Sequence, residues 1–477
     1  MCPPGSGANA ISTESGLKPQ TVRLIDLWLG RPFCFGLTLI RRAGQAAGAL
    51  AGAGRRSAQA QPVRKILLIK MIEQGATVLA YRAIERSVEM VGRENVYFWV
   101  FASNRAILDV LGLVPRENVL ALRSDNLVTF AIDVLKTLLK IRRLGIDATV
   151  DMEFFARAPA VLAFLTGARR RVGLHRFTTE GPYRGDLLTH RVAHNPYLHT
   201  AISYYLLIEA LQADPKQVPL PKLPVPKIDW SPPPLEPTQK ELLAVRGAIE
   251  AALSEADGIA ANNDADHRLP GPLILLNPNA GDLLPLRRWP TERFIELGRR
   301  LLRDDPTATL AITGAPSERE AAQEVTRQLR SQSAADAGRV ICMAGRTSLR
   351  ELIVLYTLAD LLVTNDSGPG HFASLTQLPT LVLFGPETPE LFAPLGKATN
   401  LMTANLACSP CVNAMNHRFS ACDDNVCMQE LSVDQVHARC RDLLPGRAAP
   451  KLGLTIFGQN SPAMSASNSA RNVRLGI

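Results

Sequence analysis

From Lys65 onward, short apolar runs alternate with stretches of helical periodicity, and this alternation constrains the fold of the chain more than any other feature. Strands of a parallel sheet are buried on both faces and read as continuous apolar runs, and each needs a crossover helix to reach the next. The pattern therefore predicts an α/β fold built on parallel sheets. We expect a helix at Leu127–Leu144 and strands at Ile66–Lys70, Val96–Ala102, Asn118–Leu122, Ala148–Met152, Leu273–Pro278, Ala308–Gly314, Arg339–Gly345, Leu361–Asp366 and Thr380–Gly385.

Proline interrupts this pattern between Lys216 and Pro237. Repeated proline removes backbone donors and favours an extended, semi-rigid connector. Because a chain of 477 residues exceeds what one hydrophobic core usually organises, we place a domain boundary in this stretch. The N-terminal domain is expected to span residues 63–235 and the C-terminal domain residues 236–445, and a polar, disordered tail is expected at 446–477.

Residues 1–62 are predicted to form a basic leader that contains an apolar stretch. Before Lys65, eight basic residues face two acidic ones, which accounts for +6 of the formal net charge of +9. Charges interrupt the apolar stretch 22–42, so it is too polar to span a bilayer and suits a helix that lies in an anionic membrane interface. A leader that packs against the protein itself is the alternative. The rest of the chain is nearly balanced in charge and lacks a basic stripe interleaved with aromatic residues, which argues against nucleic acid as a partner.

The cysteines bear on the cellular compartment and on metal binding. Eight cysteines in a chain of this length, without a secretory signal, fit a reducing environment. We therefore expect a cytoplasmic protein, peripheral on the inner face of the cytoplasmic membrane. Two interpretations stay open for a C-x2-C pair and the two cysteines after it: a structural zinc site, or a cluster of free or reversibly oxidised thiols. These four residues are Cys408, Cys411, Cys422 and Cys427.

The segment LLVTNDSGPGHFASL is the most informative for chemistry, because an apolar strand leads directly into a glycine-rich turn and a helix. Asp366 or Ser367 can cap the helix, and Gly368 and Gly370 let backbone N–H groups approach an anion. His371 follows one turn later and can donate to a phosphate oxygen. The segment predicts a phosphate site, and a tight strand-to-helix junction without a ligand is the alternative.

The segment LLNPNAGDLLPLRRWPTERF repeats the order of strand, loop and helix. Arg287 and Arg288 stand just before the predicted helix, where a guanidinium can neutralise the charge on a departing diphosphate. A solvated pair of charges on a loop is the alternative interpretation. We expect Trp289 to be a packing anchor and not a platform for a sugar.

Three segments, KILLIKMIEQGATVLA, NPNAGDLLPLRRWP and NDSGPGHFASLTQLPTLVLFGP, resemble in order and spacing glycosyltransferase family 9, the ADP-heptose heptosyltransferases of lipopolysaccharide core assembly. The resemblance covers roughly Lys65 to Leu444. It implies a GT-B architecture, in which two Rossmann-like domains with parallel sheets face an interdomain cleft. It also implies inverting, metal-independent transfer of a heptose or related sugar from a nucleoside-diphosphate donor, such as ADP-heptose, to a glycolipid or polysaccharide acceptor, with no cofactor required.

The resemblance also implies roles for individual residues. The C-terminal domain would hold the donor, with Arg287 as a phosphate-binding basic residue and with Gly314 and Glu318 at the nucleoside. The acceptor would lie on the side of the N-terminal domain, near Gly75. The remaining residues implied to bind the donor are Asn279, Arg288, Asp366, Ser367, Gly368, Gly370 and His371.

The first loop departs from the family pattern. The family usually carries Gly-Asp there and a proline several residues later, whereas this chain has Ala76 and Arg82 at those positions. Alanine cannot accept a proton, so we predict Glu73 as the substitute base, with Glu153 in reserve; a structural carboxylate is the alternative for both. A non-catalytic nucleotide-sugar-binding protein that has lost its base, or a GT-B nucleotide-sugar epimerase, are the competing hypotheses for the whole chain.

Overall fold

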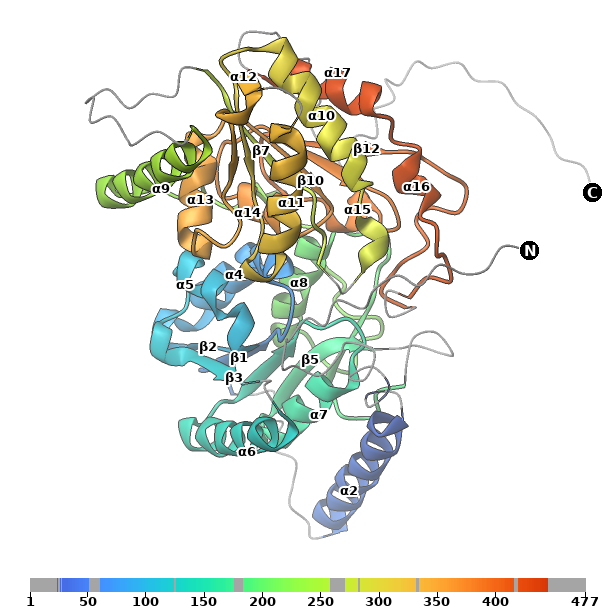
Figure 1. The fold of residues 1–477 in the computed structure, drawn as a ribbon. Helices are drawn as coiled ribbons and strands as arrows, with labels where there is room; N and C mark the ends of the chain where they lie inside the picture. The colour runs from blue at the N-terminus through green and yellow to red at the C-terminus, as the bar shows by residue number, and fades with distance from the viewer. Residues whose placement is uncertain are drawn as a thin grey trace, which may run out of the picture.

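The structure is a computed structural model that describes residues 24, 26, 28–50, 61–123, 126–175, 183–257, 271–281, 284–331, 334–415 and 419–444. The tail predicted at 446–477 lies outside these residues, as do residues 1–23, 25, 27 and 51–60 of the leader. Figure 1 shows two α/β bodies, with the N-terminal body below the C-terminal one.

Six parallel strands form the N-terminal sheet, in the order β3-β2-β1-β4-β5-β6. Successive residues of a strand point to opposite faces, so Ile66 and Leu68 pack against α4 and α8, whereas Leu67 and Ile69 pack against α6 and α7. Helices therefore cover both faces of this sheet. Its elements are β1 Ile66–Ile69, β2 Val96–Phe101, β3 Val119–Leu122, β4 Ala148–Asp151, β5 Arg170–His175, β6 His190–Ala193, α3 Gln74–Leu79, α4 Tyr81–Val91, α5 Arg105–Leu111, α6 Leu127–Leu144, α7 Arg157–Leu165 and α8 Thr200–Glu209.

The C-terminal sheet repeats this topology in the order β12-β11-β10-β7-β8-β9, again with all strands parallel. Ile274 and Leu276 pack against α10, α11 and α17, and Leu273 and Leu275 against α9, α13 and α14. The elements are β7 Leu273–Asn277, β8 Thr309–Ile312, β9 Val340–Cys342, β10 Leu361–Asn365, β11 Thr380–Phe384, β12 Thr399–Thr403, α9 Gln239–Asp257, α10 Thr291–Asp304, α11 Arg319–Arg330, α12 Ala334–Ala337, α13 Leu349–Leu358, α14 Gly368–Ala373, α15 Pro389–Phe392, α16 Val426–Gln429 and α17 Val433–Leu443.

The nine predicted strands are confirmed, with ends shifted by one to three residues, and α6 occupies the residues expected for it. Three strands were missed: β5, β6 and β12. β5 begins with two arginines and contains Gly173, and β6 and β12 lie at sheet edges where half their residues or more are only partly buried. Such strands lack the continuous apolar run on which the prediction relied.

The apolar stretch of the leader forms the helix α2, Gly30–Leu50. One side of it packs on the N-terminal domain, where Cys34 contacts the cluster around Val161 and Leu187. Just before the helix, Asp26 Oδ2 accepts from Arg157 Nη1 at 2.7 Å. Packing against the protein itself is therefore observed for this side of the leader. None of the described helices is long and apolar enough to cross a membrane.

The two domains touch through α3 and α5 on one side and α14 and α13 on the other. Val78 of α3 and Ile107 of α5 join a core cluster of the C-terminal domain. His199 Nε2, at the start of α8, lies 3.0 Å from the carbonyl oxygen of Ala393. These contacts bring the carboxyl ends of strands from both sheets to face one another.

Candidate functional site

A cavity of about 440 Å³ lies between the domains, at the carboxyl ends of strands from both sheets. The loop after β1 lines it from the N-terminal domain, and the loops after β7, β8 and β10 line it from the C-terminal domain. β1, β7 and β10 flank the points where strand order reverses, which is where open parallel sheets bind ligands. Ten predicted site residues line this cavity: Glu73, Gly75, Asn279, Arg287, Gly314, Glu318, Asp366, Ser367, Gly368 and His371.

The loops around the cavity are tied together by Asn365, a residue that the sequence analysis did not single out. Asn365 Nδ2 donates to the carbonyl oxygens of Pro278 at 2.9 Å and Asn279 at 3.3 Å. Its Oδ1 accepts from the N–H of Trp289 at 2.9 Å. Trp289 is fully buried and donates from Nε1 to the carbonyl oxygen of Leu431, so its predicted role as a packing anchor is confirmed.

The buried polar atoms at the cavity that have no hydrogen-bond partner among the described residues include three nitrogens: Asn279 Nδ2, Arg287 Nε and His371 Nδ1. Folded proteins pair nearly all their buried polar atoms, so a group of unpaired ones indicates that a ligand or water completes them. The first two are donors, and the third is a donor in one tautomer of the imidazole. The cavity therefore offers the converging donors that an anion requires.

Arg287 lies beside two buried carboxyl groups, one of which belongs to Glu387, a residue that the sequence analysis missed. Arg287 Nη1 is 3.8 Å from Asp366 Oδ2 and 3.4 Å from Glu387 Oε2. The two carboxyl groups hydrogen-bond to each other. Burial, and then the neighbouring Asp366, raises the pKa of Glu387 to about 8, and burial also raises the pKa of Asp366 against the pull of Arg287. The two carboxyl groups therefore share a proton near neutral pH, and Arg287 balances the remaining negative charge.

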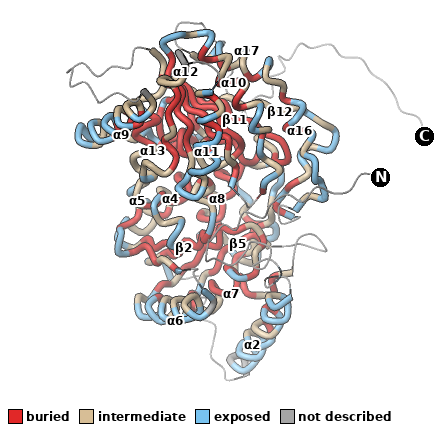
Figure 2. Tube along the Cα trace, viewed as in Figure 1, coloured by how far each residue is buried: buried red, intermediate tan, exposed pale blue. Residues whose placement is uncertain are grey.

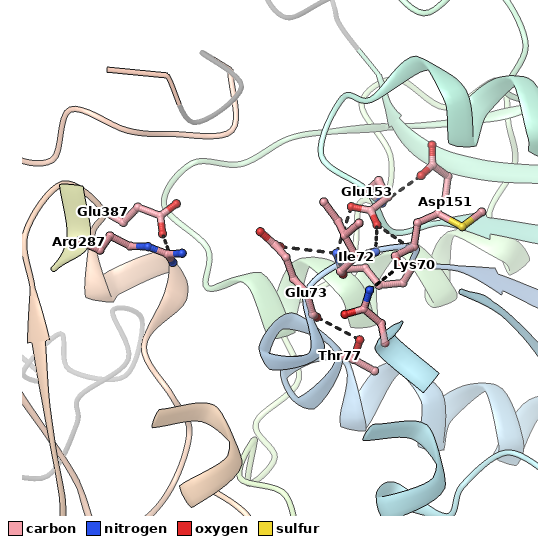
Figure 3. Close-up of polar contacts among 10 residues, drawn as sticks. Lys70, Ile72, Glu73, Thr77, Asp151, Glu153, Arg287 and Glu387 are labelled. Atoms are coloured by element: carbon pink, nitrogen blue, oxygen red, sulfur yellow. Dashed lines mark hydrogen bonds and ion pairs between the residues drawn. The ribbon is translucent and has the colours of Figure 1, made fainter. Parts of the chain in front are cut away.

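Glu73 precedes α3 with its backbone in the left-handed region, at φ 69° and ψ 89°. A residue with a Cβ is strained in this region, and such strain clusters at functional sites. The carbonyl oxygen of Glu73 accepts from the N–H of Thr77 at 3.1 Å, and its carboxylate lies 3.7 Å from Lys70 Nζ. Figure 3 shows Glu73 reaching toward Arg287 and Glu387 from the opposite wall. A carboxylate and a guanidinium thus face each other across the cavity.

Glu153, the reserve candidate for the base, lies behind Glu73 and is bound to the protein itself (Figure 3). Its Oε1 accepts from the N–H groups of Met71 at 2.7 Å and Ile72 at 3.2 Å. Its Oε2 accepts from Lys70 Nζ at 3.0 Å. Lys70 is buried, so it needs this carboxylate to compensate its charge. Glu153 therefore supports the loop after β1 from beneath and does not line the cavity.

His371 contacts the N-terminal domain at Gly75. A Cβ built at position 75 would lie 2.6 Å from Cδ2 of His371 and 3.4 Å from Cα of Gly368, so the close approach requires glycine. Burial, with smaller effects from His199 and Arg287, lowers the pKa of His371 to about 3. The imidazole is therefore neutral at physiological pH and can donate one hydrogen bond.

Arg288 and Gly370 do not line the cavity, although both were expected to contact the donor. Arg288 is exposed, and its Nη2 donates to the carbonyl oxygen of Gly281 at 3.1 Å. A Cβ at Gly370 would lie 3.2 Å from side-chain carbons of Pro394 and Val382. Arg288 therefore holds its own loop, and Gly370 permits close packing of α14 against β11.

The cysteine-rich segment does not form the zinc site that its spacing allows. Cys408 and Cys422 are exposed, Cys411 is half-buried and Cys427 is buried. Cys411 Sγ lies 3.1 Å from the hydroxyl of Ser420. Within the part of the chain that the structure describes, no three His, Cys, Asp or Glu side chains are placed to hold a metal ion. None of the four cysteines is in a disulfide in the part of the chain that the structure describes.

Comparison with known proteins decides the family. The sequence pattern of glycosyltransferase family 9 (heptosyltransferase) matches residues 140–419, which is more than half of the chain. The chain belongs to this family. The resemblance found from the sequence is therefore confirmed.

The family 9 chain has curated relatives that it matches over part of their length. Lipopolysaccharide heptosyltransferase 2 of Salmonella typhimurium is 32% identical over 124 residues, which are 26% of this chain and 34% of that protein. The chain thus spans about a third of the length of this relative.

Solved structures share the fold of this family 9 protein over both domains. ADP-heptose lipopolysaccharide heptosyltransferase II of E. coli superposes with a TM-score of 0.54 at 17% identity, over 80% of this chain and 98% of that one. The family 9 glycosyl transferase of Veillonella parvula superposes with a TM-score of 0.56 at 18% identity, over 80% of this chain and 97% of that one. The expected GT-B architecture is confirmed.

In this family 9 protein, Ala76 lines the cavity near Glu73, at the position where the resemblance described above implies an aspartate. Its methyl group cannot accept a proton. Among the described residues that line the cavity from the N-terminal domain, Glu73 is the one that carries a carboxylate.

Proposed function

We propose that this protein is a glycosyltransferase that moves a heptose or a related sugar from a nucleoside-diphosphate donor to a lipopolysaccharide-like glycolipid or polysaccharide acceptor. The observation that carries the proposal is the group of unpaired buried donors, on Asn279, Arg287 and His371, in one cavity between the domains. Membership of family 9 supports the sugar transfer, and the names of the relatives described above favour ADP-heptose as the donor and lipopolysaccharide as the acceptor.

The donor would lie against the C-terminal domain. Arg287 and His371 would bind the diphosphate with the backbone N–H of Gly368, which begins α14 and has no carbonyl partner within the helix. The nucleoside would lie near Gly314, where a Cβ would come within 3.1 Å of Asn279 Nδ2 and 3.2 Å of Glu318 Oε2. Glycine at this position leaves room for a ligand beside both side chains.

The reaction would be a single displacement with inversion at the anomeric carbon. Glu73 would remove the proton from the acceptor hydroxyl as its oxygen attacks, and the bond from the sugar to the diphosphate would break. Arg287 would stabilise the charge that develops on the departing diphosphate, without a metal ion. Glu73 and Arg287 lie on opposite walls of the cavity, as in-line attack requires.

The same proposal places the protein in the cytoplasm, with the stretch 22–42 against the inner face of the cytoplasmic membrane. A glycolipid acceptor would be presented at that surface.

The test is to incubate the full chain with ADP-heptose and a deacylated lipopolysaccharide core acceptor, and to follow ADP release and product mass. Transfer that requires both substrates is the expected result. A donor that raises the melting temperature without any product would favour a non-catalytic binding protein, for which Ala76 is the motivating observation. A new sugar isomer formed without acceptor would favour an epimerase.

A further inference from the structure

The helix α6 is apolar on two sides, and only one of them packs on the protein. The residues that face the N-terminal core are Phe130, Val134, Leu138 and Ile141. A second apolar stripe, spaced by three and four residues along the helix, is 45–70% exposed and consists of Val128, Ile132, Leu135 and Leu139. An exposed apolar stripe of this length marks a surface that meets an apolar partner.

The helix α2 and the residues before it expose a second apolar surface. Its inner side packs on α7 through Cys34 and Leu37. Its outer residues are each more than half exposed, and they are Trp28, Leu29, Phe33, Phe35, Leu39 and Ile40.

These two surfaces flank the same buried helix, α7. Leu162 of α7 belongs to the cluster that contains Ile141 of α6, whereas Val161 belongs to the cluster that contains Cys34 of α2. Arg142 Nη2, near the end of α6, donates to the carbonyl oxygen of Leu165 in α7 at 2.8 Å. Figures 1 and 2 show α2 and α6 at the end of the N-terminal domain that lies away from the C-terminal domain, with exposed outer sides.

The charged side chains beside the exposed apolar stripe of α6 and the exposed apolar surface of α2 are mainly basic. Arg31 of α2 and Lys136, Lys140 and Arg143 of α6 are exposed and form no ion pair within 4 Å among the described residues. The acidic side chains in the same region are already compensated. Asp133 of α6 is bound by Arg123 at 2.9 Å, and Asp186, which lies against α2, is paired with Arg41.

We propose that α2 and α6 together form one docking surface for an anionic phospholipid bilayer. Apolar side chains flanked by basic ones suit an interface in which the former enter the acyl region and the latter meet anionic headgroups. A second copy of the chain would meet a surface of the same positive sign, so the charge favours lipid over self-association. This inference does not depend on the transfer reaction, since binding to vesicles needs neither donor nor acceptor.

The test is co-flotation of the full chain with phosphatidylcholine vesicles that contain or lack phosphatidylglycerol. Leu135→Glu with Leu139→Glu removes the stripe of α6, and Phe33→Glu with Ile40→Glu removes that of α2. Each pair should weaken binding to the anionic vesicles by roughly tenfold or more, because each buried apolar side chain contributes about 1.5–3 kcal/mol. Lys136→Gln and Lys140→Gln should each weaken it about fivefold, since a basic residue near such a surface contributes about 1 kcal/mol.

Leu243→Glu is the matched control, because Leu243 lies on α9 of the C-terminal domain and is 59% exposed. It should float like the unchanged chain, and all variants should keep the melting temperature because the changed side chains are exposed. The inference is overturned if the unchanged chain does not bind anionic vesicles, or if the α6 variants bind as well as the control. It is also overturned if the α6 variants split a dimer in light scattering while flotation is unaffected, since a second copy would then occupy the surface.

Discussion

Gly75 of the N-terminal domain lies against the imidazole of His371 in the C-terminal domain, so close that a Cβ at position 75 would be 2.6 Å from Cδ2. This contact joins the two walls of the cavity. Gly75→Ala should force the walls apart, lower the free energy of unfolding by about 1–3 kcal/mol and raise KM for the donor. Denaturant unfolding and steady-state kinetics measure both effects.

Gly247→Ala is the control for that change, because apart from the adjacent backbone of its own helix no atom lies within 4 Å of a Cβ at this exposed position of α9. Alanine is a better helix former, so this variant should be stabilised by up to about 1 kcal/mol with unchanged kinetics. If both alanine variants behaved alike, the close packing at Gly75 would have no energetic consequence.

Glu73 and Glu153 should respond differently to the loss of charge. Glu73→Gln should lower kcat by about 10²–10⁴-fold, the usual contribution of a general base, with little change in melting temperature. Glu153→Gln should instead cost about 2 kcal/mol or more of stability, because it removes the nearer of the two carboxylates that compensate the charge of buried Lys70, at 3.0 Å against 3.7 Å for Glu73. Full turnover by Glu73→Gln would exclude Glu73 as the base.

Arg287 and Arg288 are adjacent in sequence but differ in environment. Arg287→Ala should lower kcat/KM by roughly 100-fold, the typical loss when one group that stabilises developing charge is removed. Arg288→Ala should be nearly neutral, because Arg288 is exposed and donates to the carbonyl oxygen of Gly281. Initial rates with varied donor measure the difference. Equal losses in both variants would contradict the placement of these side chains.

Glu387 should make stability depend on pH. Its pKa in the folded protein is raised to about 8 from 4.5, so the folded state holds the proton more tightly than the unfolded state. The stabilisation is complete below the unfolded value and is lost as pH rises through the folded value. The unchanged chain should therefore lose stability from about pH 5 to about pH 9, as measured by thermal unfolding.

Glu387→Gln puts a side chain that is neutral at every pH at this position. Over the same pH range this variant should lose less free energy of unfolding than the unchanged chain, by more than about 1 kcal/mol. That figure is conservative, because a shift of one pKa unit already corresponds to more than this. Glu390→Gln, which removes an exposed carboxylate on α15, should leave the profile unchanged. A Glu387→Gln profile parallel to that of the unchanged chain would show that the buried pair holds no proton.

The position of the cavity was predictable from the sequence. The runs around Leu68, Leu275 and Val363 are apolar throughout, so each predicts a buried parallel strand, and the polar residues after each run are then expected at the ligand-binding edge. Strand pairing in the structure places these edges together. Arg288 and Gly370 do not line the cavity, and spacing along a loop could not show this because it does not tell which way a side chain or a Cβ points.

The residues that were missed depend on contacts between distant segments. Glu387 follows β11 by three residues, and only the pairing of β11 with β10 places it beside Asp366. Lys70 and Glu153 are 83 residues apart in sequence and meet because β1 pairs with β4. The sequence shows that α6 has a broad apolar face. It does not show which half of that face packs on the core.

Because the backbone of Glu73 is left-handed, the residue that best stabilises the fold at position 73 differs from the residue that the proposed reaction needs. Glycine adopts this conformation freely and asparagine more readily than glutamate, so either substitution would relieve the strain. A selection for heat resistance alone should therefore enrich Gly or Asn at position 73. Each variant that it recovers would have given up the carboxylate, and a thermostable lineage of this chain would be expected to drift toward inactivity.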